Sequence, residues 1–147
     1  MLTEQANAGH WGRGGGLEGK ELYLFPDRSY VYTQWADIMP ETLMDKGQWT
    51  LEGGGLVFTP DPDVTWPQRS DRRFVAVRAK DESRDLLFGL ERSFDLLQKI
   101  LGGQEVHAAS TISIMALKRQ GDIDASTGPA FKARLLKRAR NAKAYDK

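Results

Sequence analysis

Residues 20–35, KELYLFPDRSYVYTQW, decide the fold. Aromatic and aliphatic side chains fill residues 20–25 and 28–35, and the second run has the Tyr, Val and Thr that strands favour. Pro26 and Asp27 separate the two runs, and a short turn between two such runs predicts a β-hairpin. The chain is therefore expected to pair its strands in antiparallel fashion.

Strands and turns continue on both sides of this hairpin. Further strands are expected at residues 10–16, 47–52, 56–59, 73–79, 84–90 and 110–117. Residues 36–46, around Pro40, and residues 118–128 are expected to be loops. About eight strands suffice to close a small barrel. The sequence therefore predicts a mostly β (α+β) fold, an antiparallel small barrel or half-barrel of about eight strands.

Two helices are expected to accompany these strands. Apolar side chains recur at helical spacing in residues 90–101, at Leu90, Phe94, Leu97 and Leu101, and a Gly-Gly pair follows them. This helix is expected to pack on the barrel. Residues 129–144 begin with a proline, as helices often do, and predict a second, basic helix. We therefore divide the chain into one domain at 1–128 and a basic helix or tail at 129–147.

Composition narrows the class of protein. The 147 residues include no cysteine, which rules out a disulfide framework and cysteine-ligated zinc. No apolar run approaches the roughly 20 residues of a membrane-spanning helix, and residues 1–10 do not resemble a signal peptide. A cytoplasmic protein without a membrane partner is expected.

The net charge of +1 conceals an asymmetry. Residues 1–66 hold four basic and ten acidic side chains, whereas residues 67–147 hold 17 basic and ten acidic ones. Six of these cations lie in the expected terminal helix, and the candidates for binding are the five that precede Lys143: Lys132, Arg134, Lys137, Arg138 and Arg140. The helix is expected either to dock on the acidic half of its own chain or to bind nucleic acid or an acidic partner.

Aromatic residues on the expected strands are candidates for ligand binding: Trp11, Tyr30, Tyr32, Trp35 and Trp49. Because strand side chains alternate, Tyr30 and Tyr32 share one face, and Val31 and Trp35 share the other. Small-molecule sites are often aromatic-lined, although aromatic pairs also stabilise ordinary sheets. The leading hypothesis is a non-enzymatic binding module that holds a small apolar ligand or a protein partner.

Catalytic patterns are weak, and we assign no catalytic residue, metal or cofactor. The glycine run at residues 12–16 lacks the third glycine of a dinucleotide fingerprint, because Leu17 occupies that position. A small enzyme that uses carboxylates such as Glu18, Asp37 or Glu41 is a further alternative. Asp37, Glu41 and Asp45 are spaced by four, so one helical turn would place them on one side.

The first 65 residues or so also carry an ordered set of motifs: Gly9-His10-Trp11-Gly12, Gly14–Gly16, Phe25-Pro26-Asp27, Tyr30-Val31-Tyr32, and Gly47-Gln48-Trp49 leading into Leu56-Val57-Phe58. This order resembles the lipocalin-like, calycin-type bacterial domains. The resemblance implies a small β-barrel, and known members of the wider group bind small hydrophobic molecules or have no assigned role. The chain departs from a typical lipocalin in its helix before the final strand and in having no disulfide.

Overall fold

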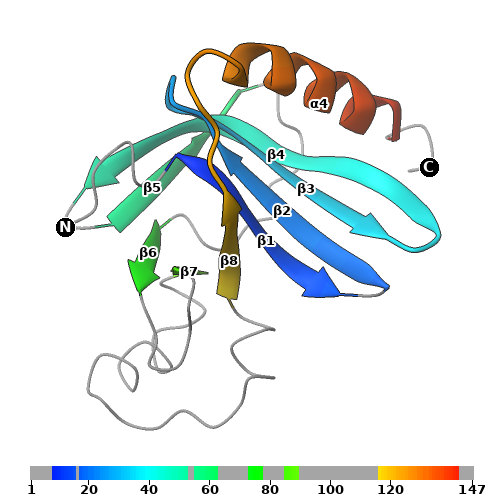
Figure 1. Ribbon diagram of the computed structural model, residues 1–147, viewed down its shortest axis with the longest axis horizontal. Coiled ribbons are helices and arrows are strands. Elements are labelled where there is room, and N and C mark those ends of the chain that lie inside the picture. The colour runs from blue at the N-terminus through cyan, green and yellow to red at the C-terminus, as the bar shows by residue number, and fades with distance from the viewer. Residues whose placement is uncertain are drawn as a thin grey trace, which may run out of the picture.

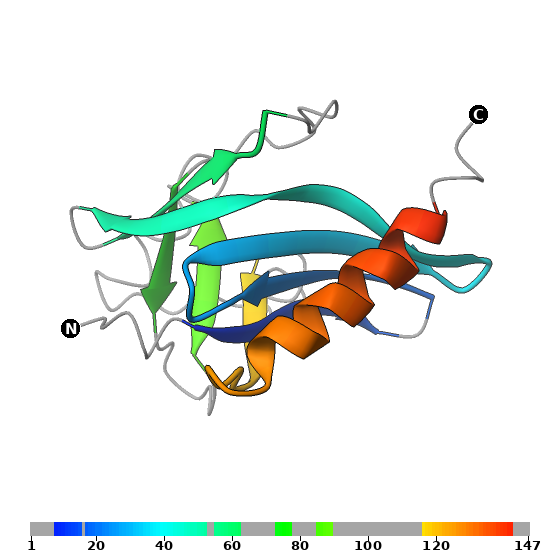
Figure 2. The same ribbon diagram turned by 90° about the horizontal axis from the view of Figure 1, so that it is seen from above.

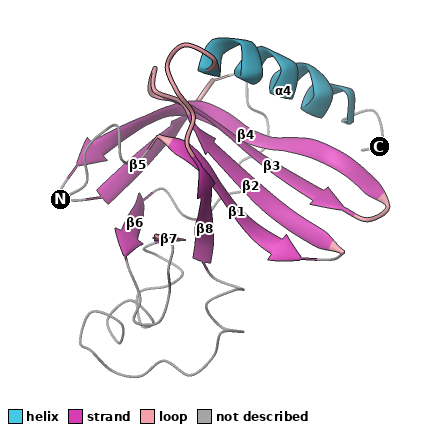
Figure 3. Cartoon of the chain, in the orientation of Figure 1, coloured by secondary structure: helices cyan, strands magenta, loops and turns pink. Residues whose placement is uncertain are grey.

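The computed structural model describes residues 8–15, 17–52, 55–62, 73–77, 85–89 and 116–142. Its eight strands form a closed barrel in chain order, in which each neighbouring pair is antiparallel (Figures 1 and 3). The strands are β1 (Gly9–Gly15), β2 (Glu18–Leu24), β3 (Ser29–Ala36), β4 (Met39–Glu52), β5 (Gly55–Pro60), β6 (Arg73–Val77), β7 (Leu86–Gly89) and β8 (Ala116–Gly121). The predicted fold class is confirmed.

The turn between β2 and β3 shows why the quoted stretch forms a hairpin. The Arg28 N–H donates to the Phe25 carbonyl at 3.0 Å, and Arg28 adopts a φ of 72°. Asp27 accepts hydrogen bonds from both the backbone N–H and the hydroxyl of Ser29. These contacts supply partners to backbone groups that the turn would otherwise leave open.

Residues 36–46 do not form the expected loop. They hold a tight turn and the first half of β4, which pairs with β3 from Met39 onward. Pro40 is tolerated because β4 pairs with β5 only from Gly47 onward, so this part of β4 lies at an edge of the described sheet. The expectation that Asp37, Glu41 and Asp45 share one side of a helical turn is therefore wrong as well.

The expected boundary between strand and loop near residue 117 is also wrong. Residues 118–121 belong to β8, where Arg119 lies opposite Trp11 and Lys118 lies opposite Leu86. The charged side chains in this segment favoured a loop in the sequence analysis, although its backbone forms the strand that closes the barrel. The expected helix at 90–101 and the expected strand residues 110–115 lie outside the described residues.

Two hydrophobic clusters form on the two faces of the sheet. Inside the barrel, Trp11, Tyr30, Trp49 and Phe58 belong to one cluster with several leucines. On the outer face, a second cluster contains Tyr23, Phe25, Val31, Leu43, Ile123, Leu135 and Ala139. The predicted alternation in β3 is confirmed, because Tyr30 enters the inner cluster and Val31 enters the outer one.

Helix α4 (Gly128–Ala142) covers the outer face of β2, β3 and β4 (Figure 2). Asp124 shapes the turn before it, because its carboxylate accepts hydrogen bonds from the hydroxyl of Ser126 and from the backbone N–H groups of Ser126 and Thr127. The Thr127 carbonyl then accepts a hydrogen bond from the Phe131 N–H. The start of α4 is thus supported by a carboxylate.

The hydrogen bonds to Asp124 make the stability of the α4 N-terminus pH-dependent. They lower the pKa of Asp124 from 3.8 to about 2, with the Ser126 hydroxyl the largest cause. A lowered pKa stabilises the fold above pH 3.8, and that stabilisation is lost as the pH falls toward 2. Asp124→Ala is expected to lower the melting temperature at pH 7 by about 3 °C.

Thermal melts from pH 7 down to pH 3 measure this difference. The difference in melting temperature between the wild type and Asp124→Ala is expected to become smaller toward pH 3. Glu52→Ala, at an exposed position, serves as a control whose melting temperature is expected to change little at pH 7. A difference that is constant over the whole range would contradict the assignment.

Candidate functional site

The surface of α4 divides into a docked side and an exposed side. Leu135 and Ala139 are fully buried against the sheet, and Phe131 and Leu136 pack beside them. These positions follow the spacing of one helix face. Arg134 and Lys137 occupy exposed positions on the same helix.

Lys132 joins the first turns of α4 to the β2–β3 turn. Its Nζ donates to the Ser29 hydroxyl at 2.8 Å and lies 3.9 Å from the Asp27 carboxylate. Partial burial opposes ionisation of Asp27, but the hydrogen bonds from Ser29 and the charge of Lys132 outweigh it and lower the pKa of Asp27. Lys132 therefore pairs with the acidic half of its own chain.

Arg138 makes the corresponding contact further along α4. Its Nη2 donates to Glu41 Oε1 at 2.6 Å, and Glu41 Oε2 accepts hydrogen bonds from Tyr23 and Thr33. Burial, followed by the charge of Glu41, raises the pKa of Tyr23, which keeps this phenol a hydrogen-bond donor. Arg138 nevertheless remains 57% exposed, so it borders the outer surface of the helix.

All the charged side chains on the exposed side of α4 are basic in the part that the structure describes. Arg134 and Lys137 make no ion pair with any described residue, and residues 128–142 contain no Asp or Glu. We call Arg134, Lys137 and Arg138 the basic face. Arg140 belongs to the same helix, but its side chain lies outside the described residues.

The structure brings four of the five candidate aromatic residues to the barrel interior. Trp11, Tyr30 and Trp49 are at most 1% exposed, and Tyr32 packs against the same cluster. Trp35 lies elsewhere. Its ring covers Gly19, where a Cβ atom would come within 2.5 Å of the indole, so it belongs to the outer face of the hairpins.

The candidate carboxylates are not gathered into one place. Glu41 lies under α4, where it contacts Tyr23, Thr33 and Arg138. Glu18 and Asp37 are exposed at the β1–β2 and β3–β4 turns. His10 stacks on Tyr23 with ring centroids 4.5 Å apart, and its Nε2 lies 3.4 Å from Glu21. Within the described ranges, no group of three or more histidine and carboxylate side chains is arranged to hold a metal ion.

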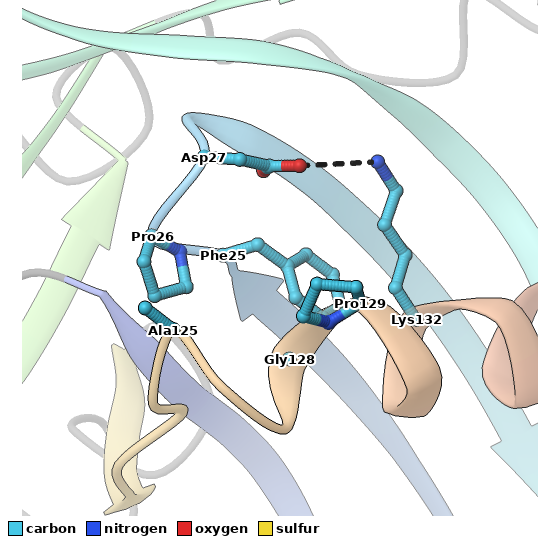
Figure 4. A pocket seen from close by; sticks show the side chains of 7 residues that line it. All are labelled: Phe25, Pro26, Asp27, Ala125, Gly128, Pro129 and Lys132. Atoms are coloured by element: carbon cyan, nitrogen blue, oxygen red, sulfur yellow. Dashed lines mark ion pairs between the residues drawn. The ribbon is translucent and has the colours of Figure 1, made fainter.

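A small hollow lies where α4 begins (Figure 4). Its volume is about 200 Å³, and Phe25, Pro26, Gly128 and Pro129 form most of its apolar wall. Asp27 and Lys132 close one side of it as an ion pair. The hollow is small for a ligand site, because such sites typically measure several hundred cubic ångströms.

Comparisons with known proteins do not assign the chain to a family. The chain matches no protein-family model, no curated protein and no solved structure. Among the described helical residues there is no stretch long and apolar enough to cross a membrane.

Sequence reasoning missed one exposed feature. Leu17 and Ile38 are 70% and 91% exposed, and they lie in the β1–β2 and β3–β4 turns. The Asp37 N–H donates to the Leu17 carbonyl at 2.7 Å, so the two turns are neighbours. This contact continues the register of the β2–β3 pair, in which Glu18 lies opposite Ala36, by one further residue.

Proposed function

We propose that this protein is a binding module that recognises an anionic partner through the basic face of α4. The observation that carries the proposal is the division of the helix. Lys132 and Arg138 fasten α4 to Asp27 and Glu41, while Arg134 and Lys137 stay exposed on a helix without acidic residues. A docked helix holds these cations in fixed positions, which lowers the entropic cost of binding a partner.

A small apolar ligand in the barrel is the less favoured form of the binding module. Trp11, Tyr30 and Trp49 pack in one buried cluster, and such packing is the ordinary role of aromatic side chains in a sheet core. The antiparallel eight-stranded barrel supports a lipocalin-like relationship as part of the proposal. A cytoplasmic location stays a prediction.

The proposal predicts binding that depends steeply on salt. Two to three cations that neutralise phosphates give a slope of about −1.8 to −2.7 in log K against log salt, so affinity for duplex DNA falls roughly 10- to 40-fold between 50 and 200 mM salt. Arg134→Gln/Lys137→Gln is expected to reduce the steepness of that slope by about 2. Fluorescence anisotropy with a short labelled DNA duplex, and separately with labelled poly-glutamate, measures both effects.

The control removes the same amount of charge from the barrel. Lys46→Gln/Arg73→Gln changes one cation paired with Asp61 and one exposed cation on β6. The control is expected to keep the wild-type slope. An equal loss in both double variants, or no binding of either probe by the wild type, would reject the basic face as the binding surface.

A further inference from the structure

The β1–β2 and β3–β4 turns together form a small exposed apolar patch with acidic residues at its border. Leu17 and Ile38 provide the apolar side chains, and the hydrogen bond from the Asp37 N–H to the Leu17 carbonyl holds the two turns together. Glu18 and Asp37, each next in the chain to one of these aliphatic residues, are both exposed. We call these four residues the hairpin tip.

The base of the hairpin tip is well supported. Trp35 lies over Gly19 and fills the space that a side chain at that position would need. The strand pairs continue to the turns, with Gly15 opposite Glu18 and Ala36 opposite Met39. The tip therefore presents its aliphatic side chains from a sheet that is already ordered, which favours docking against a surface.

The charges select the kind of surface that fits this tip. An anionic surface would repel Glu18 and Asp37, which flank both aliphatic side chains. A flat cationic surface would form ion pairs with Glu18 and Asp37 and would bury Leu17 and Ile38 at the same time. The basic face of α4 has this character, because the exposed Ala130 and Ala133 lie beside Arg134 on the same helix.

We propose that the hairpin tip of one copy docks on the basic face of α4 in a second copy. The inference uses the surface that the proposed function assigns to anionic partners, and it rests on that assignment. The tip does not dock on α4 of its own chain, since Leu17 and Ile38 remain exposed and Arg138 is bound to Glu41. The acidic first half and the basic second half of the chain thereby meet between copies.

The position of the two surfaces suits a closed dimer. The end of α4 that carries Arg138 and the turn between β3 and β4 lie toward the same end of the molecule (Figures 1 and 2). A two-fold axis at this end places each hairpin tip against the helix of the other copy. Such an arrangement contains the same contact twice and closes after two copies.

A charge exchange tests the contact. Glu18→Lys/Asp37→Lys makes the tip basic, and Arg134→Glu/Lys137→Glu makes the helix surface acidic. Each variant alone opposes like charges in both copies of the contact, so we expect association to weaken by about tenfold or more in analytical ultracentrifugation at low salt. An equimolar mixture restores opposite charges in both contacts, and we expect a heterodimer that neither variant forms by itself.

The inference is overturned if the wild type stays monomeric at every concentration tested, if either variant alone associates like the wild type, or if the mixture does not associate. Circular dichroism of each variant checks that the fold is retained. Because all four substitutions lie at exposed positions, we expect spectra like that of the wild type.

One further variant separates this inference from the proposed function. Leu17→Ser/Ile38→Ser is expected to weaken dimer formation by about tenfold, while it binds the labelled DNA duplex at least as tightly as the wild type does, because the tip no longer competes for the basic face. Duplex binding without any dimer would overturn the inference and leave the proposed function standing. If the protein forms charge-dependent dimers but binds neither the DNA nor the poly-glutamate probe, the dimer contact stands and the proposed function is rejected.

Discussion

Trp49→Ala is expected to lower the free energy of unfolding by about 3–5 kcal/mol, the range for deleting a large buried aromatic side chain. Trp49 is 1% exposed and lies in the inner cluster with Tyr30 and Phe58. Its Nε1 also donates to the Phe25 carbonyl at 3.1 Å, so the substitution leaves a cavity and removes a buried hydrogen bond.

Urea denaturation followed by circular dichroism measures this loss. Trp35→Ala provides a matched control, because it deletes the same side chain from the half-buried outer position over Gly19. The control is expected to lose clearly less stability. A loss below about 1 kcal/mol for Trp49→Ala would show that the barrel interior is not the packed cluster described here.

Leu135→Ala is expected to destabilise the protein by about 2–4 kcal/mol, because Leu135 is fully buried between α4 and the sheet. The effect extends beyond stability. The weakened helix holds Arg134 and Lys137 less firmly, so we also expect the affinity for the DNA duplex to fall. Denaturation and anisotropy on the same samples measure both quantities.

Leu136→Ala is the comparison for this substitution. Leu136 is only half-buried at the side of the same interface, so its loss is expected to be closer to 1 kcal/mol. Equal effects at the two positions would mean that α4 docks through a different face from the one described.

The parts of the fold that depend on neighbouring residues were predictable from the sequence. The β2–β3 hairpin follows from aromatic strands around a Pro-Asp turn, and α4 follows from its proline start and apolar spacing. The first half of β4 was not predictable, because Pro40 and the charged residues after it are typical of a loop. Pairing with β3 over its length outweighed those local preferences.

For the candidate site, the cations of α4 and their positions around the helix could be identified from the sequence, but their partners could not. Helical spacing places Lys132 and Arg138 beside the apolar stripe and Arg134 and Lys137 away from it. Their partners Ser29 and Glu41 lie 103 and 97 residues away in the chain, at positions fixed by the register of the sheet. Spacing within one helix carries no information about such distant neighbours.

The closure of the barrel by β1 and β8 also sets the order in which the protein can be completed on the ribosome. β1 pairs on one edge with β2, its neighbour in the chain, whereas its other edge pairs with β8, and Arg119 donates to the Ala8 carbonyl across 111 residues. Until β8 is synthesised, the inner aromatic cluster lacks one wall and a nascent chain exposes an unpaired strand edge. Because α4 follows β8 directly, the segment from Ala116 to Ala142 both completes that wall and covers the outer face. A chain interrupted before Ala116 lacks Leu117 of the inner cluster and the α4 residues of the outer cluster, so apolar side chains of both clusters lose part of their cover.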